Sequence, residues 1–142
     1  MRTVRQLLDG KPPGVHTVVT EDPVRTAIQL MADHFVGALP VLSGGRLVGI
    51  VSERDYARKV VLLGRNSSET TVATIMSAPV IQVGPQNSVN DCMMLMTDKR
   101  IRHLPVVENG ELIGVISIGD CVKAVIDEPR HEIEDLRRYI AG

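Results

Sequence analysis

The sequence predicts an α/β fold of the α+β type, in which two copies of one βαββα unit pair about a pseudo-twofold axis. The first observation is an internal repeat, because residues 15–60 align with residues 80–125 without a gap. The second is that strand-like and helix-like periods follow in the same order in both copies. The third is a 44% apolar content with only 2% aromatic residues, which leaves aliphatic side chains to fill the core. Identical pairs include Val24 and Val89, Leu39 and Leu104, Pro40 and Pro105, Gly49 and Gly114, Ser52 and Ser117, and Asp55 and Asp120.

Each copy begins with a short extended stretch and continues into a helix. We expect the extended stretches at 15–19 and 80–83. Asp22-Pro23 and Asn87-Ser88 then supply an N-cap residue and a first-turn residue. The apolar residues that follow recur with the 3.6-residue period of a helix and are interpreted as core. They are Val24, Ala27, Ile28, Met31 and Phe35 in the first copy and Val89, Cys92, Met93 and Met96 in the second.

A hairpin and a second helix complete each copy. In the first, LPVL and RLVGIVS flank the pair Gly44-Gly45, and in the second LPVV and ELIGVIS flank Asn109-Gly110. Such pairs favour the tight turn of a two-residue hairpin. The closing helices are expected at 53–63 and 118–126.

The chain organisation follows from the repeat. Residues 1–64 are predicted to form the first repeat with an N-terminal lead helix, 65–71 a polar linker, and 72–127 the second repeat. Residues 128–142 are predicted to form an amphipathic helix, with Ile133, Leu136 and Ile140 on one face. Packing of this helix on the module and a contact with a dimer mate or partner both remain open. A single repeat would leave one apolar face uncovered, so we expect the copies to pair and to form two clefts at their seam.

Composition limits the possible partners. The net charge is −1, and the chain has one Phe, two Tyr and no Trp, which argues against nucleic acid or an anionic membrane as the partner. The start MRTVRQLLDG lacks the apolar core of a signal peptide, and no apolar run is long enough to cross a membrane. Cys92 and Cys121 fall in apolar helical patterns and are interpreted as buried thiols. We therefore expect a cytoplasmic protein.

A serine and an aspartate three residues apart stand at the start of the closing helix in both copies. These pairs are Ser52 with Asp55 and Ser117 with Asp120. One interpretation is helix capping alone. The other is a nucleoside phosphate site, in which the hydroxyl and the helix amides meet a phosphate and the carboxylate accepts the two ribose hydroxyls. Arg54 adds charge near the first pair, and Arg102-His103 near the second, where the first copy has only Gly37-Ala38. The two clefts are therefore expected to differ.

These features resemble the tandem cystathionine β-synthase (CBS) domain, or Bateman module, of stand-alone bacterial type. The resemblance covers both repeats and extends to the lead segments VRQLL (4–8) and VATIM (72–76). The LPV strand, the GxxS strand end and the SxxD helix start carry it together. It implies that adenosine nucleotides bind across the seam, with ribose on the motif Asp, phosphates on the motif hydroxyl and basic residues, and adenine against the first strand of the other copy.

Carried onto this chain, the resemblance implies two nucleotide sites. One would use Ser52, Arg54 and Asp55, with Ile50 behind the base and Val80, Ile81, Ile101 and Arg102 opposite. The other would use Ser117, Asp120, Arg102, His103 and Val115, with Val15, His16 and Val36 opposite. Gly119 departs from the polar or basic residue that often precedes the Asp, which predicts weaker phosphate binding in the second site.

The sequence predicts neither catalysis nor a metal. The histidines show no metal-ligand spacing with one another or with the cysteines, and neither serine motif contains a histidine to act as its base. The leading hypothesis is a non-catalytic sensor of AMP, ADP or ATP that assembles as a homodimer and acts on a separate effector protein. The alternatives are a structural dimerisation or partner-binding adaptor with empty clefts, and the same pocket binding NAD or S-adenosylmethionine.

Overall fold

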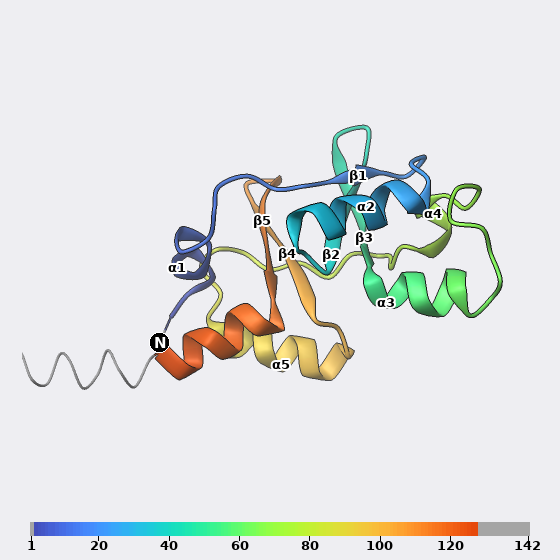
Figure 1. The fold of residues 1–142 in the computed structure, drawn as a ribbon. Helices are drawn as coiled ribbons and strands as arrows, with labels where there is room; N and C mark the ends of the chain where they lie inside the picture. The colour runs from blue at the N-terminus through green and yellow to red at the C-terminus, as the bar shows by residue number, and fades with distance from the viewer. Residues whose placement is uncertain (1, 128–142) are drawn as a thin grey trace, which may run out of the picture. The chain divides into compact units, whose positions relative to one another are not determined.

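The structure is a computed structural model that describes residues 2–127, and the predicted helix at 128–142 lies outside the described residues (Figure 1). The chain divides into two compact units. Gly14–Gln82 is called the first unit, because it contains the first repeat. The second unit combines Met1–Pro13 with the chain from Val83 onward and contains the second repeat.

The first unit holds a three-stranded sheet in the order β1-β2-β3, with β1 parallel to β2 and β2 antiparallel to β3. The strand predicted at 15–19 is reduced to its last two residues. The elements are β1 (Val18–Val19), α2 (Val24–His34), β2 (Ala38–Ser43), β3 (Arg46–Ser52), α3 (Glu53–Tyr56), the π-helix η1 (Ala57–Val61) and α4 (Val72–Ile75), and Figure 1 labels all of them except η1.

The second unit repeats this order around the antiparallel pair β4–β5. At the stretch predicted as a strand at 80–83, only Val83 joins the sheet, through a single parallel bridge to Val106. Residues 118–127 form the closing helix after β5. The other elements are α1 (Val4–Asp9), α5 (Val89–Lys99), β4 (His103–Glu108) and β5 (Glu111–Ser117).

Both hairpins have the predicted tight turns. The two central residues adopt positive φ in each turn, at 56° and 79° for Gly44 and Gly45 and at 52° and 80° for Asn109 and Gly110. Two consecutive positive values define the turn type whose twist matches that of the flanking strands. The α+β fold class and the repeated order of elements are confirmed.

The helix boundaries shift slightly from the predicted ones. Pro23 rather than Asp22 is the N-cap of α2, and Asp22 instead accepts a hydrogen bond from the Val19 amide at 2.9 Å. Ser88 rather than Asn87 caps α5, in a reciprocal capping box with Asp91.

One predicted core residue is wrong. Phe35 was placed on the apolar face of the first helix, but its side chain is 95% exposed. Phe35 is the C-cap of α2 and has a left-handed backbone with φ of 55°, which turns it away from the helical face. Met31 and Ala27, one and two turns earlier, are buried as expected.

Each lead segment packs in the unit that contains the other repeat, not the repeat with which it was grouped. α1, which the sequence analysis grouped with the first repeat, packs against β5 of the second unit, and Leu8 lies directly over Gly114. α4, grouped with the second repeat, packs in the first unit, where Val72 and Ile75 join the core cluster. Met76, which follows α4, lies over Gly49 of β3.

Each unit has its own aliphatic core. In the first it is formed by Val18, Val24, Ala27, Met31, Leu39, Val41, Val51, Val60, Val72 and Ile75. In the second unit the buried residues include Val4, Val89, Cys92, Leu104, Ile116 and Cys121. No helix within residues 2–127 is both long and apolar enough to cross a membrane.

Candidate functional site

The first Ser–Asp pair forms a reciprocal cap where β3 passes into α3. The Asp55 amide donates to Ser52 Oγ at 3.1 Å, and the Ser52 amide donates to Asp55 Oδ2 at 2.9 Å. The Ser52 hydroxyl also donates to Oδ2 at 3.0 Å. The carboxylate is thus fixed at the junction of strand and helix, with only 13% of the side chain exposed.

The second Ser–Asp pair repeats this geometry where β5 passes into the helix at 118–127. The Ser117 amide donates to Asp120 Oδ2 at 2.8 Å, and the Asp120 amide donates to Ser117 Oγ at 3.1 Å. The capping interpretation of both motifs is therefore realised, and it leaves a half-buried carboxylate at the same place in each unit.

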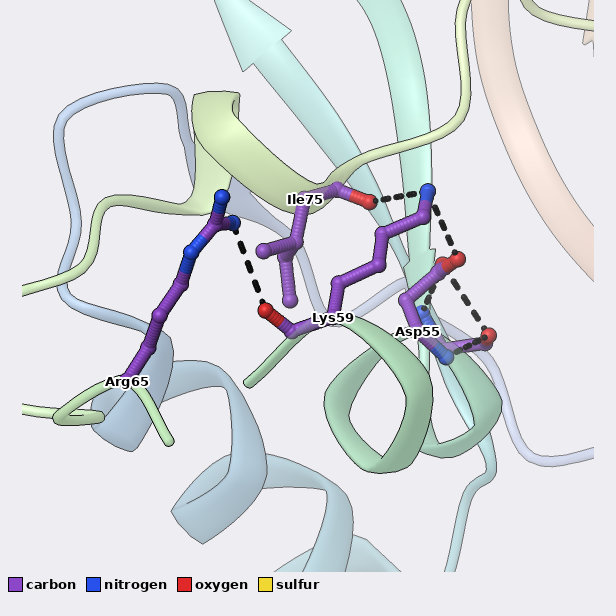
Figure 2. A network of polar contacts seen from close by, with 5 residues as sticks. Asp55, Lys59, Arg65 and Ile75 are labelled. Carbon is purple, nitrogen blue, oxygen red and sulfur yellow. Dashed lines mark hydrogen bonds and ion pairs between the residues drawn. The ribbon is translucent and has the colours of Figure 1, made fainter. Parts of the chain in front are cut away.

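A lysine that the sequence analysis did not select pairs with Asp55. Lys59 Nζ lies 3.2 Å from Asp55 Oδ1 and donates to the carbonyl oxygen of Ile75 at 2.9 Å. Figure 2 shows the Lys59 side chain extending from its helix between these two groups, while Arg65 donates to the backbone oxygen of Lys59 at 3.3 Å. The ammonium therefore joins the motif carboxylate to the last residue of α4, which belongs to the second lead segment.

Asp120 is paired with a second unselected lysine. Lys11 Nζ donates to Asp120 Oδ2 at 2.8 Å and to the carbonyl oxygen of Val115 at 2.9 Å. Lys11 follows α1, so here the ammonium comes from the first lead segment and reaches the repeat. In each unit, one lysine contacts both the motif carboxylate and a backbone carbonyl.

The two lysine–aspartate pairs differ in whether they could be predicted from the sequence. Lys59 lies four residues after Asp55 in a predicted helix, a spacing that brings side chains together, so the pair was accessible to sequence reasoning. Lys11 is 109 residues from Asp120, and no local pattern connects them.

The surroundings of Asp120 alter two pKa values. Burial is the largest influence on Asp120 and disfavours its charge, but hydrogen bonds from Lys11 and Ser117 outweigh it, so the pKa of Asp120 lies below its ordinary value. His103 pairs with Ser117 in the β4–β5 ladder. Burial lowers the pKa of His103, with Lys11 and Arg102 acting in the same direction against Asp120. At neutral pH the site therefore contains an ionised carboxylate, an ammonium and a neutral imidazole.

The other residues predicted for the first site fall in both units. Ile50 lies on β3, and its backbone exchanges hydrogen bonds with Ser77 at 3.2 and 2.8 Å. Val80 and Ile81 are half-buried in the same unit. Arg54 lies in α3 and makes no ion pair with any residue in 2–127; Lys59 supplies the paired cation instead. Ile101 and Arg102 belong to the second unit.

The residues predicted for the second site are likewise divided. Val115, Ser117, Asp120 and His103 are grouped in the second unit around Lys11, and the Arg102 backbone oxygen accepts from the Ile118 amide at 2.8 Å. Val15, His16 and Val36 belong to the first unit. There the His16 ring stacks on His34, with 3.6 Å between the ring centroids.

The chemistry of the donor set suits a ribose and an anion. A carboxylate accepts from the two hydroxyls of a ribose, and an ammonium offers a point charge to a phosphate. The serine hydroxyls are already held in the helix caps. Within residues 2–127, no three or more His, Cys, Asp or Glu side chains gather in a group that could hold a metal ion.

The fold and the motif geometry define a paired-repeat α+β protein with one Ser-x-x-Asp helix start in each repeat. The chain belongs to the CBS domain family, whose model matches residues 11–62 and 72–127. It contains two CBS domains, one in each repeat.

Known proteins from several organisms are similar to this chain. CBS domain-containing protein CBSX3, mitochondrial, from Arabidopsis thaliana is 46% identical over 128 residues, which cover 87% of this chain and 62% of that relative. The structure of a putative signal-transduction protein with CBS domains from Burkholderia ambifaria is similar with a TM-score of 0.85 and 53% identity, over 88% of this chain and 94% of that one.

A third similar structure contains bound ligands. The CBS domain pair of protein MJ0100 is described in complex with 5-methylthioadenosine and S-adenosyl-L-methionine. Its TM-score is 0.74 at 24% identity, over 90% of this chain and 98% of that chain. At this identity, the likeness shows the fold alone.

Proposed function

We propose that this protein is a non-catalytic sensor that binds AMP, ADP or ATP and transmits occupancy to a dimer mate or an effector protein. The observation that carries the proposal is the recurrence, in both units, of a half-buried carboxylate fixed at a strand end with an ammonium beside it. A helix cap made by serine and aspartate does not require a lysine. A nucleotide, in contrast, offers ribose hydroxyls to the carboxylate and a phosphate to the ammonium.

The roles follow the chemistry of each group. Asp55 and Asp120 accept the ribose hydroxyls, because an ionised carboxylate forms stronger hydrogen bonds than a neutral acceptor. Ile50, Val80 and Ile81 in the first site, and Val115 in the second, offer aliphatic surface to the base. Arg54, Arg102 and His103 are the proposed phosphate contacts alongside the motif serines.

Two other ligands share the adenosine group. NAD and S-adenosylmethionine present the same ribose and base, and the MJ0100 structure shows that a CBS-domain pair elsewhere in the family accommodates the second. Binding assays on this chain therefore need a panel rather than a single nucleotide.

The test is isothermal titration of the purified chain with AMP, ADP, ATP, NAD and S-adenosylmethionine, with native mass spectrometry of the untreated protein. We expect one or two equivalents of an adenosine nucleotide to bind, and a co-purified ligand of matching mass. Absence of binding by all three nucleotides would contradict the sensing function. Saturable binding of S-adenosylmethionine alone would reassign the ligand.

A second candidate is a dimerisation adaptor, and exposed apolar side chains on equivalent helices favour it. Val61 and Ile126, which lie one residue beyond the aligned segments at the same offset, are 56% and 62% exposed, and Leu62 is 76% exposed. Aliphatic groups of this size at matched positions suit a contact with a second copy of the chain.

Size-exclusion chromatography with light scattering separates the two candidates. The single variants Val61→Asp and Ile126→Asp should dissociate a dimer built on these faces. Deleting residues 128–142 should leave nucleotide binding intact in a sensor, whereas an adaptor that works through that segment should lose its dimer or its partner. The cytoplasmic location stays a prediction, since the mitochondrial description belongs to the Arabidopsis relative.

A further inference from the structure

The two motif lysines come from positions that are not equivalent in the repeat. The residue that aligns with Lys59 in the second repeat is Ala124, which is buried. Leu8 and Met76 occupy matching places over the glycines of β5 and β3. Lys11 lies three residues after Leu8, and the residue three positions after Met76 is Pro79, so Pro79 is the counterpart of Lys11 in the sequence. Neither lysine therefore has a counterpart of its own kind.

The ammonium nevertheless reaches the same place in both units. Lys59 approaches Asp55 from its own helix, and Lys11 approaches Asp120 from the lead segment. A feature inherited through duplication would occupy aligned positions. A cation supplied twice from unrelated positions instead indicates that the charge beside the carboxylate is itself required.

Stability alone gives a weak reason for that requirement. The lysine side chains are 38% and 40% exposed, and ion pairs as open to solvent as these contribute little to folding. Backbone amides already satisfy one oxygen of each carboxylate through the caps. The recurring cation is better explained by a ligand that takes it as a partner.

We propose that Lys11 and Lys59 are specificity-determining residues, which make the two sites select phosphate-bearing adenosine ligands over adenosine and S-adenosylmethionine. This inference rests on the proposed nucleotide binding and names the ligand class. When ribose hydroxyls occupy the carboxylate, the neighbouring ammonium loses part of its counter-charge. A phosphate restores that charge, whereas a neutral nucleoside does not, and a sulfonium adds a further positive charge.

The two carboxylates differ in which of their oxygens already have hydrogen-bond partners. Asp55 has partners on both oxygens, Lys59 on Oδ1 and Ser52 on Oδ2, so a ribose there must compete with the lysine. At Asp120 both Ser117 and Lys11 bind Oδ2, and Oδ1 has no hydrogen-bond partner among residues 2–127. Removing Lys59 should therefore strengthen adenosine binding, while removing Lys11 should mainly weaken binding of the phosphorylated ligand.

The test is titration of ATP, adenosine and S-adenosylmethionine into the full chain and its Lys11→Met, Lys59→Met and double variants. Lys123→Met, on the exposed side of the helix at 118–127, removes the same charge elsewhere and serves as the matched control. The single-site backgrounds Asp120→Ala and Asp55→Ala separate the two sites. The Lys→Met change should lower the ratio of ATP to adenosine affinity at each site about fivefold, the upper end of the range expected for a partly exposed charge contact.

Arginine at either position should restore the ratio, because it keeps the charge. Lys11→Gln and Lys59→Gln provide neutral polar replacements if a methionine variant does not fold, as judged by circular dichroism. A ratio that is unchanged in the folded neutral variants would overturn this inference while leaving nucleotide binding in place. A wild-type chain that binds none of AMP, ADP and ATP would instead overturn the proposed function itself.

Discussion

Leu8 lies so close over Gly114 that a Cβ at residue 114 would stand 2.5 Å from Leu8 Cδ2. The equivalent contact in the first unit joins Gly49 to Met76, where a Cβ would lie 2.8 Å from Met76 Sδ and 2.9 Å from the backbone oxygen of Ser77. The GxxS strand end of each repeat therefore needs glycine because a lead segment crosses it. Through these contacts, one lead segment packs on each repeat.

Gly49→Ala should destabilise the chain more than Gly114→Ala. At Gly49 the new methyl group meets a backbone atom that cannot move alone, and overpacking of this kind costs about 1–3 kcal/mol. At Gly114 it meets only the end of the Leu8 side chain, so the loss should be about 1 kcal/mol or less. Urea unfolding measures both.

Gly10→Ala is the control for these glycine variants. A Cβ there meets nothing closer than 3.6 Å, so its effect should be near zero. If Gly49→Ala proved as stable as the wild type, the tight crossing of the second lead over β3 would be contradicted.

Gly119→Arg should strengthen phosphate binding at the second site. Gly119 aligns with Arg54, and a Cβ at residue 119 meets only Ser117 Oγ, at an ordinary contact distance of 3.6 Å. The variant should therefore fold and gain about twofold to fivefold in ATP affinity in an Asp55→Ala background, with no gain for adenosine. Gly119→Gln is the neutral control, and an equal gain with glutamine would show that charge is not responsible.

Protonation of His103 should make stability depend on pH in the mildly acidic range. Its pKa in the folded chain lies below the ordinary value of 6.5, chiefly because of burial, so the unfolded chain binds the proton more readily. This contribution to stability is fully present above pH 6.5 and is lost as the pH falls towards the folded value. Urea midpoints measured from pH 8 to pH 5 should fall less steeply in His103→Asn than in the wild type. Parallel curves would contradict the assignment.

Both thiols should be inert in the native chain. Burial, with Cys121 and Asp91 nearby, raises the pKa of Cys92 to about 11, and burial raises that of Cys121 as well. At pH 8, about one Cys92 in a thousand is a thiolate. A coloured disulfide reagent should therefore report almost no reaction until denaturant exposes both cysteines. Ser43→Cys, at an exposed hairpin position, is the positive control.

Local patterns were sufficient for the predicted fold. The Asn109-Gly110 and Gly44-Gly45 turns and the caps at Ser52 and Ser117 depend on neighbouring residues, and all of them are present in the structure. Phe35 was wrong because the helical period does not reveal where the helix ends. The π-helix of Ala57–Val61 was missed because nothing in its composition separates it from an α-helix.

Long-range relationships were less accessible. The packing of α1 on β5 depends on the fit of Leu8 to Gly114, which no local pattern records. The same packing brings Lys11 to Asp120. The serine and the carboxylate of each motif were therefore predictable from the sequence, whereas the lysine beside each carboxylate was missed.

The most direct measurement of the central claim is titration of ATP into Asp55→Ala, Asp120→Ala and the double variant, with Glu53→Ala as an exposed carboxylate control on α3. The account predicts that each single variant loses at least about tenfold in affinity at one site, because charge-assisted hydrogen bonds to the ribose are removed. The double variant should not bind, and Glu53→Ala should bind as the wild type does. Unchanged ATP affinity in the folded double variant would contradict the account.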